Sequence, residues 1–417
     1  ETVANQKKTE QAVTKEAEQR RRAEAVIDRT LQLLDDATSQ SMGDAVTTQR
    51  TIPKEQQRFY SEILNYYEDL SNASGDDRGK RMRFANAALR VGKLKSALGL
   101  HDEALANFEN ARTKFERLAS EFPHDADCRF GVARSESDLA NVWSNLGQLQ
   151  SMRDAAGRSL AIHKALHSEF PDRAEYKHGI AQMYSLLALP KPHQTDLYFD
   201  TELLETGIAI EQELAEKYPQ VSQYGRLLAS LQFYRAYDSH TKGDHDVAFS
   251  WLTKALSTAR NLVAHSDSVA EDRQGLARIL STMSAACASH ARLREGEGAG
   301  REAVDLYSQL TSEFPGITSY RRSLAGAYHQ LAILQRYIGK RDQSVKNVQI
   351  ARSYYEAMLI DRPDNVRILN GLGSVYETIA SAKRATAASQ EELQECLAHP
   401  LSKLVIWGIV AGLIYHS

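Results

Sequence analysis

A short stretch that returns at a fixed interval constrains the fold of this 417-residue chain more than any other feature. Its prolines lie 48 or 96 residues apart, and each follows an aromatic residue or an arginine. Asp267 stands at the one missing position, and Gly75 lies one interval before the first proline. A period of this size is the signature of a repeat array. The five stretches are Glu121-Phe122-Pro123, Glu169-Phe170-Pro171, Lys217-Tyr218-Pro219, Glu313-Phe314-Pro315 and Asp361-Arg362-Pro363.

Aligned on seven anchors at 75, 123, 171, 219, 267, 315 and 363, the sequence forms columns of constant character. The ninth residue after each anchor is apolar, the tenth is alanine or glycine, and the seventeenth is small. Steps of three, four and seven keep side chains on one helical face, where small residues let two helices approach closely. The small column is Gly92, Ala140, Ala188, Ala236, Ser284, Ala332 and Ala380.

Each unit divides into two helices. Gly99, Gly147, Gly243 and Gly339 stand 24 residues after their anchors, where a glycine with positive φ can end the first helix. The second helix runs to the next anchor, where proline stops it. The sequence therefore predicts an all-α solenoid of six antiparallel helix pairs over 75–386, with a trailing helix at its end.

The columns resemble those of the tetratricopeptide (TPR) motif when the turn glycine is placed at motif position 15. The small column then falls at motif position 8, and the alanines at motif position 27 are Ala111, Ala255, Ala303 and Ala351. Each unit looks like a TPR unit stretched from about 34 residues to 48 by lengthening both helices. The resemblance covers about 75–386 and implies a right-handed solenoid.

The TPR resemblance also implies where a ligand binds. In TPR arrays the first helix of each pair lines a concave groove, and Asn141 matches a position where asparagine holds a peptide main chain. Amides and guanidiniums suit this task because they offer several directional donors. Ser137 stands where a carboxylate-binding clamp has lysine, so that match is incomplete. By register the groove residues are Asn86, Lys93, Arg134, Asn141, Asn145, Gln182, Tyr237, Arg278, His329, Arg336 and Tyr337.

A narrower resemblance concerns the context of the array. The runs Ala23-Glu24-Ala25-Val26, Leu64-Asn65-Tyr66-Tyr67-Glu68-Asp69-Leu70 and Ser319-Tyr320-Arg321-Arg322-Ser323-Leu324-Ala325 are similar to the TPR tails of large bacterial serine/threonine protein kinases. That family implies a preceding kinase domain, yet this sequence has no His-Arg-Asp loop, Asp-Phe-Gly or strand-borne glycine-rich loop. The resemblance therefore implies the non-catalytic part of such a protein.

The two ends differ from the array. Residues 1–50 are predicted to form a charged helix, either coiled coil or solvated, and a linker, and 51–74 a leading helix. In the tail 387–417, the apolar segment 404–415 would span about 18 Å as a helix, against the ~30 Å of a bilayer core. It is a cap over the last repeat, a short or truncated membrane anchor, or a tail unrelated to the fold. Because the chain begins with Glu1, we expect a piece of a longer protein. The sequence leaves two locations open, cytoplasmic or membrane-associated, the latter through 404–415 or through a segment before Glu1.

Composition and motifs indicate no enzyme. Charged residues are 25% and the net charge is −3, so bulk electrostatics favour neither nucleic acid nor an anionic membrane. The three cysteines are far apart and fit neither a disulfide framework nor a zinc site. We predict no catalytic residue, no metal and no cofactor. The partner we expect is a protein or peptide, with the oligomeric state open.

Several local patterns have competing interpretations. We favour a solvated helix face over a metal site for His163 and His167, and a polar turn over a calcium loop for 238–246. The glycine-rich run 296–300 is interpreted as a flexible turn that shortens the second helix of the fifth unit, not as a phosphate loop, because no strand precedes it. The prolines in 188–193 are expected to end the first helix of the third unit early.

Charge also follows the repeat. Basic residues stand six after five anchors and acidic residues two before four of them. We favour local pairing across the proline turn over a basic ladder for an acidic partner.

The first functional hypothesis is a non-catalytic module that binds a peptide or partner protein in the concave groove. The alternatives are a sensory or scaffolding kinase tail and a structural spacer.

Overall fold

The structure is a computed structural model, and it describes residues 65, 69, 77–97, 100–190, 199–264, 269–290, 292–315, 317–361, 363 and 365–385. The charged helix and linker predicted over 1–50, the leading helix apart from residues 65 and 69, and the tail 387–417 lie outside this set. The described helices are α3 (Arg78–Ala97), α4 (His101–Glu121), α5 (Ala126–Asn145), α6 (Leu149–Glu169), α7 (Ala174–Leu187), α8 (Thr201–Lys217), α9 (Ser222–Thr241), α10 (His245–Ala264), α11 (Ala270–Ser289), α12 (Leu293–Glu313), α13 (Thr318–Tyr337), α14 (Arg341–Asp361) and α15 (Val366–Ala385).

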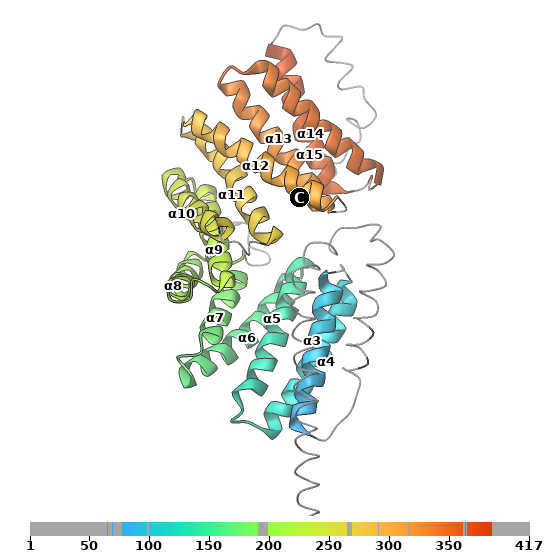
Figure 1. Cartoon of the computed structure of the whole chain (residues 1–417), viewed down its shortest axis with the longest axis vertical. Helices are drawn as coiled ribbons and strands as arrows, with labels where there is room; N and C mark the ends of the chain where they lie inside the picture. The colour runs from blue at the N-terminus through green and yellow to red at the C-terminus, as the bar shows by residue number, and fades with distance from the viewer. Residues whose placement is uncertain are drawn as a thin grey trace, which may run out of the picture.

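The predicted all-α solenoid of antiparallel helix pairs is confirmed. Helices α3 to α14 form six successive pairs along a curved path, and α15 follows as the first helix of a seventh unit (Figure 1). The first helices of successive units begin at 78, 126, 174, 222, 270, 318 and 366, each 48 residues after the last. Among the described helices, each first helix from α3 to α13 packs against its own second helix, and each from α5 to α15 packs against the second helix of the preceding pair.

First helices form the inner layer of the curve. Within the described residues, successive first helices contact one another, whereas successive second helices do not. A layer whose members touch is more tightly curved than one whose members are splayed. The inner face is therefore built from α3, α5, α7, α9, α11, α13 and α15.

The recurring stretch ends one pair and starts the next. The backbone N–H of Phe122 donates to the carbonyl of Leu118 at 2.8 Å, and the carboxylate of Asp125 then accepts from the N–H of Asp127 at 3.0 Å. The same backbone bond closes α6, α8 and α12 at their aromatic residues. An N-cap carboxylate satisfies donors that a new helix leaves open, and Asp125 does this for α5. Helices α7, α9 and α13 start without a side-chain cap, so the feature that the stretches share is the helix stop.

Three of the four predicted glycine turns within pairs are also confirmed, and Gly99 lies outside the described residues. Gly147, Gly243 and Gly339 have φ values of 72°, 86° and 80°. This left-handed conformation costs glycine little and other residues more, which explains the glycine 24 residues after these anchors.

An aromatic side chain over a glycine joins successive pairs. A Cβ added to Gly131 on α5 would lie 2.2 Å from the ring of Phe115 on α4, and one added to Gly371 on α15 would lie 2.5 Å from Tyr355 on α14. Both contacts join a residue 40 after its anchor to one 8 after the next anchor. This pair of columns is not evident in the sequence because other units hold different residues there, such as Ser323.

The two irregular units have different outcomes. Helix α7 has 14 residues and ends at Leu187, so its early end is confirmed. The interpretation of 296–300 as a flexible turn was wrong, because α12 begins at Leu293 and has 21 residues. Gly296 and Gly300 lie four apart on its buried face, where added Cβ atoms would come within 2.8 Å of Cys287 and of Ser284 on α11. These glycines let two helices approach closely.

The repeating ion pairs join the two helices of one unit and do not cross the proline turn. Arg81 binds Glu121 at 2.5 and 2.7 Å, and Arg273 binds Glu313 at 2.6 Å twice. Each bond runs from the start of a first helix to the end of its own second helix, since the two helices are antiparallel. The predicted pairing across the proline turn is therefore wrong. The charged residues pair instead between the two helices of one unit.

In the described part of the chain, no helix has the length and apolarity needed to cross a membrane.

Alanine substitutions in α12 test the close approach to α11. Gly298→Ala should raise stability by up to about 1 kcal/mol, the helix-propensity cost of glycine, because nothing lies within 4 Å of the added Cβ. Gly296→Ala gains the same propensity but places its Cβ 3.0 Å from the carbonyl oxygen of Ser284. We expect a higher thermal midpoint for Gly298→Ala and a lower one for Gly296→Ala, followed by circular dichroism. Equal stabilisation by both would contradict the packing role.

Candidate functional site

The eleven predicted groove residues lie along the inner helices but not in one site. Three of them bond to the next inner helix: Lys93 to Asp138 at 3.5 Å, His329 Nε2 to Thr378 at 2.8 Å, and Arg336 to Ser381 at 3.2 Å. These bonds place the three side chains on the inner face, where they tie neighbouring units together.

The remaining predicted residues are spread along the same layer. The amide of Asn86 donates to the carbonyl of Met82 at 2.9 Å, and Arg134 lies 5.8 Å from the ring centroid of Phe130. Tyr337 is 63% exposed, beside Arg336. Asn141, Asn145 and Gln182 are exposed.

Arg278 and His329 come together in a groove of about 580 Å³. Its walls are the inner faces of α11, α13 and α15, and its floor includes Tyr307 of α12 and Tyr355 of α14. The walls carry hydroxyl, amide and imidazole groups. Of these groups, only the imidazole of His329 was predicted from the sequence to lie in a groove. The wall residues besides Arg278 and His329 include Ser281, Thr282, Gln330, Ser374, Glu377 and Thr378.

Two buried tyrosines form part of the floor of the groove. Tyr307 and Tyr355 are buried, and burial raises the pKa of both phenols, so they are neutral at physiological pH.

Burial is the first cause of the raised pKa of Tyr355, and the charge of Arg322 opposes it in part. For Tyr307 burial is also the first cause of the raised pKa, and the hydroxyl of Ser323 opposes it in part. Burial also lowers the pKa of His329, which favours a neutral imidazole that both donates and accepts. The groove thus offers both hydrogen-bond donors and hydrogen-bond acceptors.

A second cleft, of about 300 Å³, contains Tyr237. It lies between α9, α10 and α11, and its lining is mostly apolar, with Phe233, Phe249 and Leu252. The Nδ1 atoms of His240 and His245 face each other at 3.3 Å. Only Tyr237 of this cleft was predicted from the sequence, because the other side chains meet through tertiary packing.

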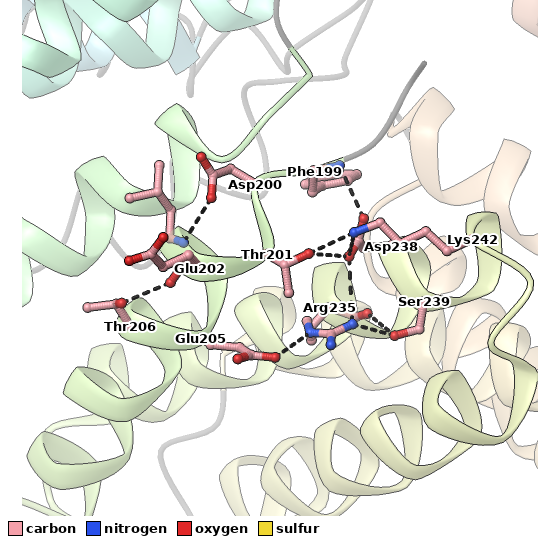
Figure 2. A network of polar contacts seen from close by, with 11 residues as sticks. Phe199, Asp200, Thr201, Glu202, Glu205, Thr206, Arg235, Asp238, Ser239 and Lys242 are labelled. Atoms are coloured by element: carbon pink, nitrogen blue, oxygen red, sulfur yellow. Dashed lines mark hydrogen bonds and ion pairs between the residues drawn. The ribbon is translucent and has the colours of Figure 1, made fainter.

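The stretch 238–246, predicted to be a polar turn, begins inside the last turn of α9 and ends inside α10, so the turn itself is shorter than predicted. Its first residue is a buried acid with a structural task. The carboxylate of Asp238 accepts from the backbone N–H of Phe199 at 3.2 Å, from the hydroxyl of Thr201 at 2.9 Å and from Lys242 at 2.8 Å (Figure 2). These bonds hold the start of α8 against α9, after the early end of α7. Asp238 is therefore already occupied by the chain's own donors.

The interpretation of His163 as a solvated side chain was wrong. It is 2% exposed, and its ring lies 2.2 Å from where a Cβ on Gly179 would be. It occupies the aromatic position that Phe115 fills one unit earlier. Burial lowers the pKa of His163 to about 4, and the nearby charge of His178 contributes to this shift. His163 is a core residue in the neutral form.

Among the described residues, no three His, Cys, Asp or Glu side chains are placed to hold a metal ion. His178 and Glu211 form a buried polar pair whose side chains lie 2.9 Å apart. Burial raises the pKa of Glu211, and the hydrogen bond from His178 partly opposes this shift.

Comparisons with known proteins add solved structures only. No protein-family model matches the chain, and neither does any curated protein. The crystal structure of apo RapI matches with 13% identity and a TM-score of 0.46, over 78% of this chain and 99% of RapI. BtubC (BKLC) from P. vanneervenii matches with 15% identity and a TM-score of 0.43, over 62% of this chain and 92% of BtubC. The TPR protein TTC0263 from Thermus thermophilus matches with 20% identity and a TM-score of 0.34, over 58% of this chain and 98% of that chain. At these values the fold assignment rests on the helices themselves.

The buried histidine makes stability depend on pH. Because the pKa of His163 is about 4 when folded, against an ordinary value of 6.5, the unfolded chain binds a proton in this window that the folded chain does not. Stability should therefore fall as pH falls from 6.5 toward 4, by about 3 kcal/mol from this group. His163→Phe, which repeats Phe115, should flatten this dependence in urea unfolding measured across pH.

The matched control is His124→Phe, at an exposed position in a turn. It should keep the pH dependence of the parent chain. An unchanged slope in His163→Phe would refute the assignment of the acid sensitivity to this side chain.

Proposed function

We propose that the chain is a non-catalytic interaction module that binds an extended peptide, or an extended segment of a partner protein, in the groove of α11, α13 and α15. The observation that carries the proposal is the groove itself, with polar side chains from three inner helices above two tyrosines. Its volume of about 580 Å³ falls within the ~300–1,000 Å³ common for ligand sites.

The chemistry of the walls favours a peptide. An extended main chain presents N–H and C=O groups in alternation, and hydroxyl, amide and neutral imidazole groups can meet both. Three packed helices hold these groups in place, so little side-chain freedom is lost on binding. Arg278 and Glu377 give the groove charges of opposite sign on α11 and α15, which would orient the peptide.

The inner surface continues toward the N-terminus beyond this groove. Asn141 and Arg134 on α5 would extend the contact along the array, as the register of the stretched TPR-like units suggests. The double variant Asn141→Ala with Arg134→Ala tests this extension separately from the groove.

A second candidate role is the sensory or scaffolding tail of a bacterial serine/threonine protein kinase. The sequence runs at 23–26, 64–70 and 319–325 favour it. Sequencing the gene upstream of Glu1 tests this role, since it requires a kinase reading frame there.

Filling the groove should abolish peptide binding without unfolding the chain. Ser374 is exposed in the groove, and its hydroxyl bonds to the Asn370 carbonyl of its own helix, at 3.2 Å. Peptides selected from a random library on the parent chain should bind Ser374→Trp at least tenfold more weakly in fluorescence polarisation, because the indole occupies their space.

Ser353→Trp is the matched control. Ser353 is exposed on the outer helix α14, and its hydroxyl also bonds within its own helix, to Ile350 at 2.8 Å. Selected peptides should bind this variant as they bind the parent chain. Equal binding to all three proteins would refute the groove as the binding site.

A further inference from the structure

Two arginines stand at one end of the groove. Arg322 on α13 lies one helical turn before Gly326, and Arg367 on α15 lies one turn before Gly371. Both glycines line the groove, and residues four apart share a helical face. The two arginines therefore lie just beyond the groove lining, on the same helix faces as Gly326 and Gly371, and they form a cationic end at the N-terminal ends of α13 and α15.

Among the described residues, little compensates the charge of Arg322. Its side chain is half-buried, and burial, followed by the charge of Arg367, lowers the pKa of its guanidinium. Its other electrostatic neighbours are the phenols of Tyr307 and Tyr355. Among the side chains that the structure describes, no carboxylate forms an ion pair with Arg322 or Arg367.

The same two positions hold an ion pair earlier in the array. Arg226 and Glu271 lie 96 residues before Arg322 and Arg367, which is two repeats (322 − 226 and 367 − 271). Arg226 on α9 lies 3.5 Å from the carboxylate of Glu271 and binds Asp272 at 2.7 and 3.2 Å. At these repeat positions, a carboxylate on one inner helix thus pairs with an arginine on the preceding inner helix.

At the end of the array both acids are replaced. Arg367 stands where Glu271 would be, and Ile368 where Asp272 would be. A like charge near a half-buried guanidinium is unfavourable, and an added carboxylate would relieve it. Arginine binds carboxylates through two parallel N–H···O bonds. A carboxylate is therefore the group that we expect beside Arg322 and Arg367.

We infer that Arg322 and Arg367 bind a carboxylate of the peptide in the groove, so that the partner is an acidic peptide. This inference rests on the proposed function, because the same groove holds the rest of the peptide. Glu377, the acid that lines the groove, lies ten residues after Arg367 on α15. At 1.5 Å per residue that is about 15 Å away, so it does not neutralise the cationic end.

The test uses two fluorescein-labelled peptides, acetyl-(Gly-Ser-Glu)4-amide and the same peptide with glutamine in place of glutamate. In fluorescence polarisation at physiological salt, we expect saturable binding of the glutamate peptide, at least tenfold tighter than that of the glutamine peptide. Arg322→Gln should weaken the glutamate peptide at least tenfold. The absence of saturable binding of the glutamate peptide, or equal affinity for both peptides, would overturn the inference.

Arg367→Glu provides a second, opposite readout. It restores the acid that Glu271 supplies to Arg226, so it should raise the thermal midpoint of the free chain and abolish binding of the glutamate peptide. A lower midpoint would show that the two arginines already have a counter-charge, which would overturn the inference.

Arg341→Glu is the control for net charge. Arg341 is exposed at the start of the outer helix α14, and its replacement changes the charge by the same amount. Binding of the glutamate peptide should stay within twofold of the parent chain. A loss equal to that of Arg367→Glu would mean that bulk charge drives binding, and the inference would fail.

Ser374→Trp separates this inference from the proposed function. If it blocks both peptides while they bind the parent chain equally, the groove function stands and the carboxylate site fails. If it leaves the glutamate peptide bound while Arg367→Glu releases it, the arginines act without the groove and the proposed function fails.

Discussion

The structure depends on the close approach between each second helix and the first helix of the next unit. Where that approach is closest, a ring lies over a glycine, as with Phe115 over Gly131 and Tyr355 over Gly371. A Cβ at either glycine would overlap the ring, so the missing side chain sets the distance between units. Together with the other contacts between successive units, this close approach curves the array and gathers the first helices into an inner layer.

The functional surface follows from that curvature. The groove exists because α11, α13 and α15 are neighbours on the inner side, with Tyr307 and Tyr355 between them as its floor. The tyrosines therefore have two roles, since they pack between successive units and form the floor of the groove. Their neighbour Arg322 lies at the end of the array, where Arg367 has replaced the acid that an equivalent arginine binds two repeats earlier.

Several residues took roles that spacing alone did not indicate. His163 has the sequence context of an exposed helical residue, yet it fills an aromatic position over Gly179. Gly296 and Gly300 look like a flexible turn in the sequence, yet they lie inside α12 against Ser284. In both cases the meaning of the residue depends on what the adjacent helix places opposite it. A single sequence does not show that contact.

The sequence by itself determined the fold class, the repeat and the turns. Proline cannot continue a helix and glycine alone adopts positive φ at little cost, so both act locally and can be read from spacing. It also placed Arg278 and His329 on inner helices. The tertiary structure decided which first-helix residues meet in a groove and which are buried bridges between helices. It also decided that Arg81 pairs with Glu121 of its own unit. Those outcomes depend on distances between helices, which packing fixes and periodicity does not.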